Sequence, residues 1–352
     1  MACFGFCIFP RAAWAWNAEG HMIIAQIAYN HLDPQVKAKC DELIGVSLSP
    51  YNSNSTSNFV TAAVWADDFK SDLGTGSSHY IDLLFSLDGT PTNGVTLEDT
   101  NVVIAIRQDI AILQNPTASQ ASQATALRYL LHFVGDIQQP LHCSTAVWAS
   151  KPGGDAGGNG FTFSNSSDWS NLHSLWDYGG GFLPNNISRP LNSSSQASLT
   201  SLAASIEADY PYSKSIGSIP DPMVWAVEGE TIAQTNCYVG ITLGGTLSTA
   251  YTNKAQATTR QRMAIGGQRL AKLLNTIFAT NAPVVAYAAL NNTNFSFSWG
   301  SVSGRTYRVQ WKQQITDPTW TDLIDIPASN SLSCFSESTT ATQRLYRAIV
   351  VN

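Results

Sequence analysis

The chain has 352 residues, of which 44% are hydrophobic and only 12% are charged, and its net charge is -6 at pH 7. This length allows one large domain or two, with a sizeable core. A protein that grips nucleic acid through many phosphate contacts is normally basic, and this chain has no run of Lys or Arg. Any such contact would therefore need bound metal for much of its positive charge.

Residues 1–15 resemble part of an export signal, because they are apolar and end in Ala13-Trp14-Ala15, an A-x-A-like cleavage site. Arg11 lies at the wrong end of the apolar run, so the signal is interpreted as truncated; a plain apolar N-terminus is the alternative. No later stretch is long and apolar enough to span a membrane. Many Ser, Thr and Asn residues are typical of a secreted protein, and we expect an extracellular or periplasmic location.

Helical spacing of apolar residues predicts a series of helices after this segment. The first covers residues 21–32 and stops at Pro34, and the others cover residues 61–70, 96–114 and 124–136. In the last of these, His132 and Asp136 are four residues apart and share one helical face. Pro140 should turn the chain just before His142.

The Gly-rich residues 151–160 lack the spacing of a phosphate-binding loop, and we interpret them as a flexible loop at the rim of a site. A simple surface turn is the alternative. The segment 171–177 repeats the earlier arrangement, since His173 and Asp177 are again four residues apart. Residues 224–241 and 259–278 predict two more helices, and the Leu-rich stripe of the second indicates core packing.

After Pro283 the apolar residues alternate with period two, as in Phe295, Phe297 and Trp299, which predicts strands. We therefore expect a mainly α protein in which a helical domain, residues 16–283, is followed by a small all-β sandwich, residues 284–352. Four cysteines lie beyond residue 15, without the paired spacing of zinc-thiolate sites. In an exported protein they indicate one or two disulfides, with buried free thiols as the alternative: Cys40, Cys143, Cys237 and Cys334.

Eight His and Asp residues in apolar segments predict a multi-metal site, because zinc takes imidazole nitrogen and carboxylate oxygen. Each alone would be an ordinary surface or core residue, but together they include five of the six histidines, and buried polar groups need partners. His31 lies outside the pattern. The candidate ligands are His21, Asp67, His79, His132, Asp136, His142, His173 and Asp177.

These residues, in this order and spacing, resemble the trinuclear-zinc, single-strand-specific nucleases often called S-one and P-one, which are related in fold to the bacterial zinc phospholipases C. The match covers roughly residues 16–280 and rests on Trp16 to His21, Trp65-Ala66-Asp67, His79-Tyr80-Ile81-Asp82, His132 through Asp136 and Gln139-Pro140-Leu141-His142, Gly157-Gly158-Asn159, and Leu172-His173 with Trp176-Asp177. Departures from the family pattern occur at Asn17, Gln138 and Tyr178.

The resemblance implies three zinc ions. The first ion would be held by Asp67, His79, His132 and Asp136, and the second by His142, His173 and Asp177. The third would be held by His21, the bridging Asp136, and the free amine and carbonyl of Trp16. A zinc-activated hydroxide, which Asp67 would orient, would attack phosphorus. The products would be 5′-mononucleotides from single-stranded DNA and RNA, and 3′-nucleotides would lose their phosphate.

The family's substrate contacts carry over to a second set of positions. Tyr80 would stack on a base and Asp82 would hydrogen-bond to it, Lys70 would contact phosphate, and Gly158 and Asn159 would lie at the substrate. Alternatively, Tyr80 is a core aromatic and Lys70 is a solvated helix end. A base inside a duplex cannot enter such a pocket, which favours single strands.

Two other interpretations remain at this point: a zinc phospholipase C with the same metal cage, and a non-catalytic protein in which zinc is structural. No obligate protein partner is evident. The C-terminal part resembles the fibronectin-III-like modules of secreted bacterial enzymes, through Gly304 to Trp311 and Leu345 to Ala348. We interpret it as a spacer, surface-binding or sorting module.

Overall fold

A computed structural model describes residues 16–95, 99–164, 169–213, 221–278, 285–291, 293–301, 304–314, 316–330, 332–339 and 343–351. The predicted export signal lies outside these residues. The chain divides into two compact units, residues 1–277 and 278–352. The predicted boundary at 283 falls outside the described residues. Each unit is described separately below.

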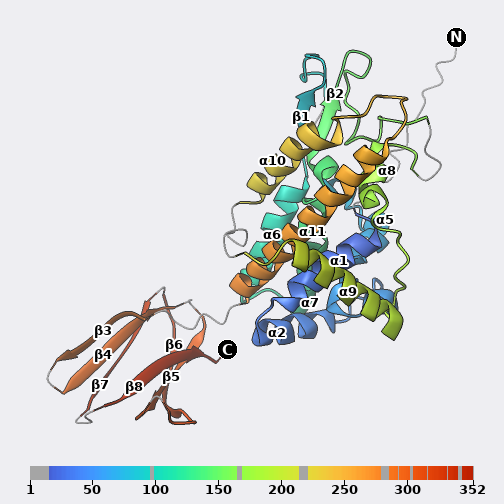
Figure 1. Cartoon of the computed structure of the whole chain (residues 1–352). Coiled ribbons are helices and arrows are strands. Elements are labelled where there is room, and N and C mark those ends of the chain that lie inside the picture. Colours follow the sequence, from blue (N-terminus) through green and yellow to red (C-terminus); the bar gives the residue numbers. More distant parts are fainter. Residues whose placement is uncertain are drawn as a thin grey trace. The chain divides into compact units, whose positions relative to one another are not determined.

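The first unit is built around three long helices (Figure 1): α1 (Ala18–Asn30), α7 (Gln120–Asp136) and α11 (Thr249–Ile277). The side chain of Asn17 caps α1 by accepting a hydrogen bond from the backbone N–H of Gly20 at 3.2 Å. α1 packs most closely on α11, where a Cβ at Gly267 would lie 2.4 Å from Ile27. The absence of a side chain there lets the two backbones approach each other.

The remaining helices pack around these three. Pro34 ends the first predicted helix but is also the first residue of α2 (Pro34–Ile44). The predicted helix 61–70 is instead three short helices, α3 (Phe59–Ala62), α4 (Trp65–Asp68) and α5 (Lys70–Leu73). α6 (Val102–Gln114) and α10 (Pro222–Ile232) lie in predicted helical segments, and the π-helical turn η5 (Ala233–Cys237) extends α10. α9 (Ser193–Asp209) lies where no helix was predicted.

Short elements connect the helices at the site. They include the 3₁₀ helices η1 (Asn54–Thr56), η2 (Gly76–His79), η3 (Pro140–Cys143) and η4 (Gly179–Gly181), and helix α8 (Leu172–Asp177). Strands β1 (Leu83–Ser86) and β2 (Ser144–Val147) pair in parallel. Just before this pairing, Ile81 donates its backbone N–H to the carbonyl of His142 at 2.8 Å. The segment after His79 therefore lies against the segment after α7.

The second unit is all-β, with sheets of order β3-β4-β7 and β6-β5-β8. Its strands are β3 (Val285–Asn291), β4 (Asn294–Gly300), β5 (Thr306–Lys312), β6 (Thr321–Pro327), β7 (Leu332–Ser338) and β8 (Leu345–Val350). Phe297 and Trp299 from one sheet share a core with Tyr307 and Val309 from the other. The predicted fold class, mainly α followed by a small β-sandwich, is confirmed.

The cysteines favour the alternative of free thiols. Cys40, Cys143 and Cys237 are buried thiols and Cys334 is an exposed one, and none of the four forms a disulfide in the described part of the chain. The expected disulfides are therefore not present in this structure. Across the described residues, no helix combines the length and the apolar character needed to cross a membrane.

Candidate metal centre

Six elements bring the eight predicted ligands together, and all eight side chains are buried. α1 carries His21, α4 carries Asp67, η2 ends at His79, α7 carries His132 and Asp136, η3 carries His142, and α8 carries His173 and Asp177. The sixth histidine, His31, instead pairs with Glu207. The predicted pairs on α7 and α8 each present two side chains to the same side of one helix.

Asp136 lies at the middle of the larger group. Its Oδ1 is 3.4 Å from Nε2 of His21, and its Oδ2 is 3.0 Å from Nδ1 of His79 and 3.3 Å from Nε2 of His132. The imidazole rings of His21 and His132 are stacked, with centroids 3.9 Å apart. The two oxygens of one carboxylate thus face different histidines, as expected of a bridging ligand.

Asp67 completes the larger group. Its Oδ1 is 3.6 Å from Nε2 of His132 and 3.8 Å from Nδ1 of His79. The same oxygen accepts a hydrogen bond from Nζ of Lys70 at 3.1 Å, and both side chains are buried. Lys70 is therefore not a solvated helix end, and its ammonium lies beside the candidate ligands.

The smaller group contains His142, His173 and Asp177. Nε2 of His142 is 4.0 Å from Oδ1 of Asp177, and Nε2 of His173 is 3.6 Å from its Oδ2. Gln139 donates from Nε2 to Asp177 Oδ1 at 2.8 Å. The sequence motif contained Gln139, but its role as the residue that orients Asp177 was not predicted.

Three of the histidines are oriented by backbone carbonyls. Nδ1 of His132 lies 2.7 Å from the carbonyl of Ala63, and Nδ1 of His173 lies 2.6 Å from that of Gly157. Nδ1 of His142 lies 2.8 Å from the carbonyl of His79. A carbonyl accepts only, so each Nδ1 carries a proton and Nε2 is the ring nitrogen that faces the cluster.

The buried polar atoms of the larger group need a partner that the protein does not supply. Neither ring nitrogen of His21, nor Nε2 of His79, nor either oxygen of Asp136 has a hydrogen bond of ordinary geometry in the described structure. Such groups are costly to bury without a partner. An imidazole and carboxylate donor set of this kind suits zinc. The residues present therefore fit a metal.

Electrostatics tie the carboxylates to the histidines. Burial lowers the pKa of His132, but Asp136 and Asp67 outweigh burial and raise it to about 9, so a metal ion at this ring would displace a proton. Burial lowers the pKa of His21 to about 3, which keeps its ring neutral and able to coordinate. Burial alone would raise the pKa of Asp136, but His132 and His79 hold it well below its usual value. Burial raises the pKa of Asp177 well above its usual value, so that carboxylate needs a cation to stay ionised.

Trp16 lies beside this group. Its side chain is fully buried, and its Nε1 donates to the carbonyl of Gly135 at 3.1 Å, next to Asp136. The following residue, Asn17, donates its backbone N–H to the carbonyl of Asp177 at 3.0 Å. The N-terminal segment is therefore held against both α7 and α8.

The predicted substrate positions lie around the Gly-rich loop. Tyr80 and Asp82 are half-buried, and Asp82 accepts a hydrogen bond from the hydroxyl of Thr145. That hydroxyl accepts a hydrogen bond from the backbone N–H of Gly157 at 3.1 Å. Gly158 is buried, and Nδ2 of Asn159 donates to a carbonyl of its own loop at 2.8 Å. The loop therefore belongs to the site, because its carbonyl at Gly157 orients His173.

Two of the three departures from the family pattern, Asn17 and Gln138, have structural roles. Asn17 caps α1 and also donates from Nδ2 to the carbonyl of Leu183 at 2.9 Å. Gln138 is buried, and its Oε1 accepts from Arg262 at 2.6 Å and from Arg269 at 3.3 Å. Tyr178, at 37% exposure, follows Asp177 at the surface.

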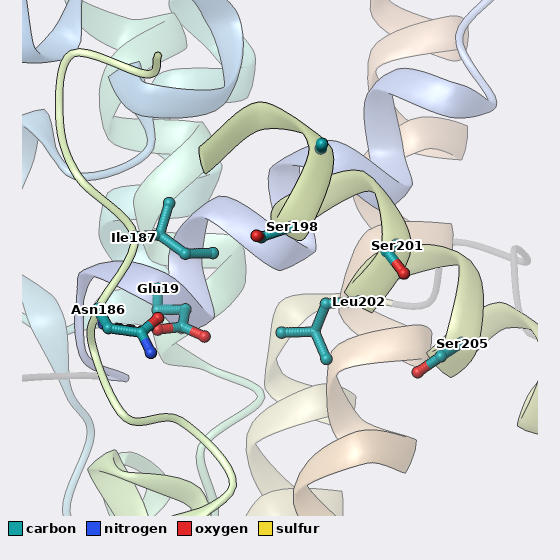
Figure 2. Close-up of a pocket in the computed structure, with 8 residues that line it drawn as sticks. Glu19, Asn186, Ile187, Ser198, Ser201, Leu202 and Ser205 are labelled. Carbon is teal, nitrogen blue, oxygen red and sulfur yellow. Dashed lines mark hydrogen bonds between the residues drawn. The ribbon is translucent and has the colours of Figure 1, made fainter. Parts of the chain in front are cut away.

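A pocket of about 560 Å³ lies elsewhere, between α1, α9 and residues 186–187, and no candidate ligand lines it. Figure 2 shows Glu19 beside Asn186 at one end and the serines of α9 at the other. Glu19 accepts the backbone N–H of Asn186 at 3.0 Å, and burial raises the pKa of its carboxyl. This carboxyl holds the loop in place rather than joining the metal centre.

A family model described as S1/P1 Nuclease matches residues 16–279. The chain belongs to the S1/P1 nuclease family. The resemblance seen in the sequence is thus confirmed, and the coarse activity is that of a nuclease, a hydrolase of phosphodiester bonds whose substrate is nucleic acid. Membership in this metal-dependent family agrees with the buried His and Asp groups.

Similar proteins align with about three quarters of the chain. Nuclease S1 of Aspergillus oryzae is 27% identical over 293 residues, which cover 76% of this chain and 93% of that protein. Nuclease P1 of Penicillium citrinum is 26% identical, covering 74% and 97%, and Endonuclease 2 of Arabidopsis thaliana is 28% identical, covering 75% and 90%. Among solved structures, the alpha toxin from Clostridium absonum aligns with 94% of this chain and 86% of its own, at a TM-score of 0.41 and 10% identity.

Proposed function

We propose that this nuclease is a secreted, zinc-dependent endonuclease and 3′-nucleotidase that hydrolyses single-stranded DNA and RNA to 5′-mononucleotides. The observation that carries the proposal is the pair of buried His and Asp groups, with orphaned ligand atoms, in a chain of this family. We assign the chemistry to residues 16–283 and an accessory role to residues 284–352.

Three zinc ions would be held mainly by the buried His and Asp side chains. Asp67, His79, His132 and Asp136 would hold one ion; His142, His173 and Asp177 would hold a second. The two-sided placement of Asp136 supports its role as a bridge to a third ion at His21 and the amine and carbonyl of Trp16. When bound, zinc supplies an activated water and stabilises the charge of the leaving oxygen.

The chain's own residues would orient the reaction. Asp67 is held by Lys70 and lies at the edge of the larger group, where its carboxylate can accept a hydrogen bond from the attacking water. The ammonium of Lys70 can stabilise an incoming phosphate. Tyr80 would stack on a base, with Asp82 fixed by Thr145 to accept from the base edge. Gly158 and Asn159 would border the substrate from the loop.

Asp136→Asn tests this function. The amide keeps the shape of the side chain but removes its charge, so hydrolysis of single-stranded DNA should fall at least about a hundred-fold, with fewer zinc ions per chain. Asp68→Asn is the matched control, because Asp68 is next to Asp67 but pairs with Arg189 at 2.7 and 3.0 Å instead. Full activity and normal zinc content in Asp136→Asn would remove Asp136 from the bridging role.

The substrate is tested with the unaltered protein. Turnover of single-stranded DNA, double-stranded DNA and short-chain phosphatidylcholine is compared, and the products are separated to locate the phosphate. We expect fast release of 5′-mononucleotides from single strands only. Preferential turnover of the lipid would reject the nuclease assignment in favour of the phospholipase alternative.

A further inference from the structure

A hydrogen-bonded row crosses the face of the β6-β5-β8 sheet. Gln310 on β5 is in register with Arg347 on β8 and with Asp322 on β6. Its Oε1 accepts from Nε of Arg347 at 2.7 Å, and its Nε2 donates to Asp322 Oδ1 at 2.5 Å. The guanidinium of Arg347 is exposed yet held in one orientation. β5, β6 and β8 lie side by side in Figure 1.

The ring of Trp320, which immediately precedes β6, covers two cations on this face. The Cζ atom of Arg347 is 4.3 Å from the ring centroid and Nζ of Lys312 is 4.9 Å from it. Lys312 also donates to the carbonyl of Asp317 at 3.2 Å. Trp320 is only half-buried, so part of its indole surface is open to solvent. We call Trp320, Lys312 and Arg347 the Trp320 patch.

The charge of this patch differs from that of its surroundings. Arg308, on the same strand as Lys312, forms ion pairs with Asp322 at 2.9 Å and with Asp325 at 2.7 Å. Among the described residues, no carboxylate forms an ion pair with Arg347. Residues 278–352 contain five Lys or Arg against four Asp or Glu, although the whole chain contains 19 against 25. Arg347 is therefore an exposed cation without an ion-pair partner among the described residues, although Asp322 lies on the same face through its hydrogen bond with Gln310.

We propose that the Trp320 patch is an accessory binding site for single-stranded nucleic acid. A base would stack on the open part of Trp320, and Arg347 and Lys312 would contact the phosphates on either side of that base. An aromatic platform combined with positive charge binds single strands without sequence preference. Because the two units belong to one chain, a long strand bound at the patch would reach the active site intramolecularly, at a raised effective concentration. This inference rests on the proposed function for the identity of the polymer.

Binding is measured on the full chain carrying Asp136→Asn, with a labelled oligothymidylate of about 20 nucleotides. Adding Trp320→Ala should weaken binding about tenfold, which corresponds to about 1.4 kcal/mol. Arg347→Gln should reduce the slope of log affinity against log salt by about 0.7. Arg308→Gln is the matched control: Arg308 lies on β5, the strand that carries Lys312, its charge is already paired with Asp322 and Asp325, and the variant should bind like its parent.

Kinetics on the active chain give a second readout. Trp320→Ala and Arg347→Gln should raise KM for long single-stranded DNA, leave kcat unchanged, and leave turnover of a dinucleotide unchanged, because a dinucleotide occupies only one site. If Trp320→Ala does not fold, Trp320→Tyr, which keeps the stacking face, and the exposed Arg347→Gln carry the test.

The outcomes separate the two proposals. If the unaltered protein hydrolyses its substrate normally, but neither patch variant changes binding or KM, the proposal for the Trp320 patch alone is overturned. Absence of hydrolysis by the unaltered protein would reject the proposed function. The binding comparison would still decide whether the Trp320 patch binds nucleic acid. Binding to a sulfated polysaccharide, which has no bases, is measured in the same variants. If Trp320→Ala weakens that binding as much as it weakens binding of the oligonucleotide, the patch is assigned to a polysaccharide instead of a nucleic acid.

Discussion

Gly135 lies in α7 at a position where any side chain would press on His21. A Cβ built there lies 2.7 Å from Nδ1 and 3.1 Å from Cε1 of His21. Ordinary contacts begin at 3.4 Å, so in Gly135→Ala the imidazole would have to withdraw by about 0.7 Å. Metal–ligand distances in proteins tolerate only about 0.2 Å. The substitution should therefore take His21 out of coordinating range.

The same substitution should not weaken the fold itself. Gly135 lies in a helix, where alanine is more favourable than glycine by roughly 0.5–1 kcal/mol. The displaced, buried ring of His21 opposes this gain, so we expect the metal-free variant to melt close to its parent. Metal affinity should fall at least about tenfold, since even indirect disturbance of a ligand costs 10–100-fold.

The assay combines zinc per chain, zinc affinity by competition with a chelator, and thermal unfolding with and without zinc. Gly76→Ala is the control, because a Cβ at Gly76 meets nothing within 4 Å. Unchanged zinc affinity in Gly135→Ala would refute the reasoning, since His21 would then have room to move or would not be a ligand. A large drop in the melting temperature of the metal-free protein would instead place the damage in the core.

Three further predictions concern other parts of the first unit. Tyr80→Ala should weaken binding of single-stranded DNA by about 1–3 kcal/mol while leaving the zinc content intact; unchanged affinity would make Tyr80 a packing residue. A chain that begins at Trp16 should hold one zinc ion more than a chain that begins at Met1, because the nitrogen of Trp16 is a basic amine in the first and a non-basic amide in the second. This extra ion should be the first lost on acidification, since a proton competes for the amine. Equal zinc content and equal rate in the two chains would exclude the amine as a ligand. Burial raises the pKa of Asp109 to about 8, and its Oδ2 has no partner in the described structure. The folded state therefore binds a proton that the unfolded state releases above about pH 4, and stability is lost as the pH rises towards 8. Asp109→Asn should raise the melting temperature at pH 7 by an amount that shrinks towards pH 4; a difference that is the same at both pH values would contradict this.

The sequence predicted which His and Asp residues the fold gathers, but not the groups that orient them. The spacing of His132 and Asp136 is a local property of one helix, so residue order alone indicated that they share a face. The carbonyls of Ala63, Gly157 and His79 that orient the histidines could not be predicted, because any residue type offers the same carbonyl. Only the tertiary arrangement decides which one meets an imidazole.

Two errors in the helices have physical reasons. Pro34 was interpreted only as a helix stop, although proline also fits the first turn of a helix, where its missing N–H is not needed. α9 begins at Ser193 in a Ser-rich stretch with weak amphipathic character. Serine favours caps and turns, so the segment did not resemble a helix, and packing against α1 and α11 outweighs that preference.

The candidate ligands come from segments that are far apart in the chain, from α1 to α8. The unfolded chain has no such site, so every ion that binds the native state also shifts the folding equilibrium by mass action. An ion present at a hundred times its dissociation constant adds about 2.7 kcal/mol to the free energy of unfolding. Zinc would then join α1 to α8 as a set of reversible cross-links, and a chelator would act on this protein as a denaturant as well as an inhibitor.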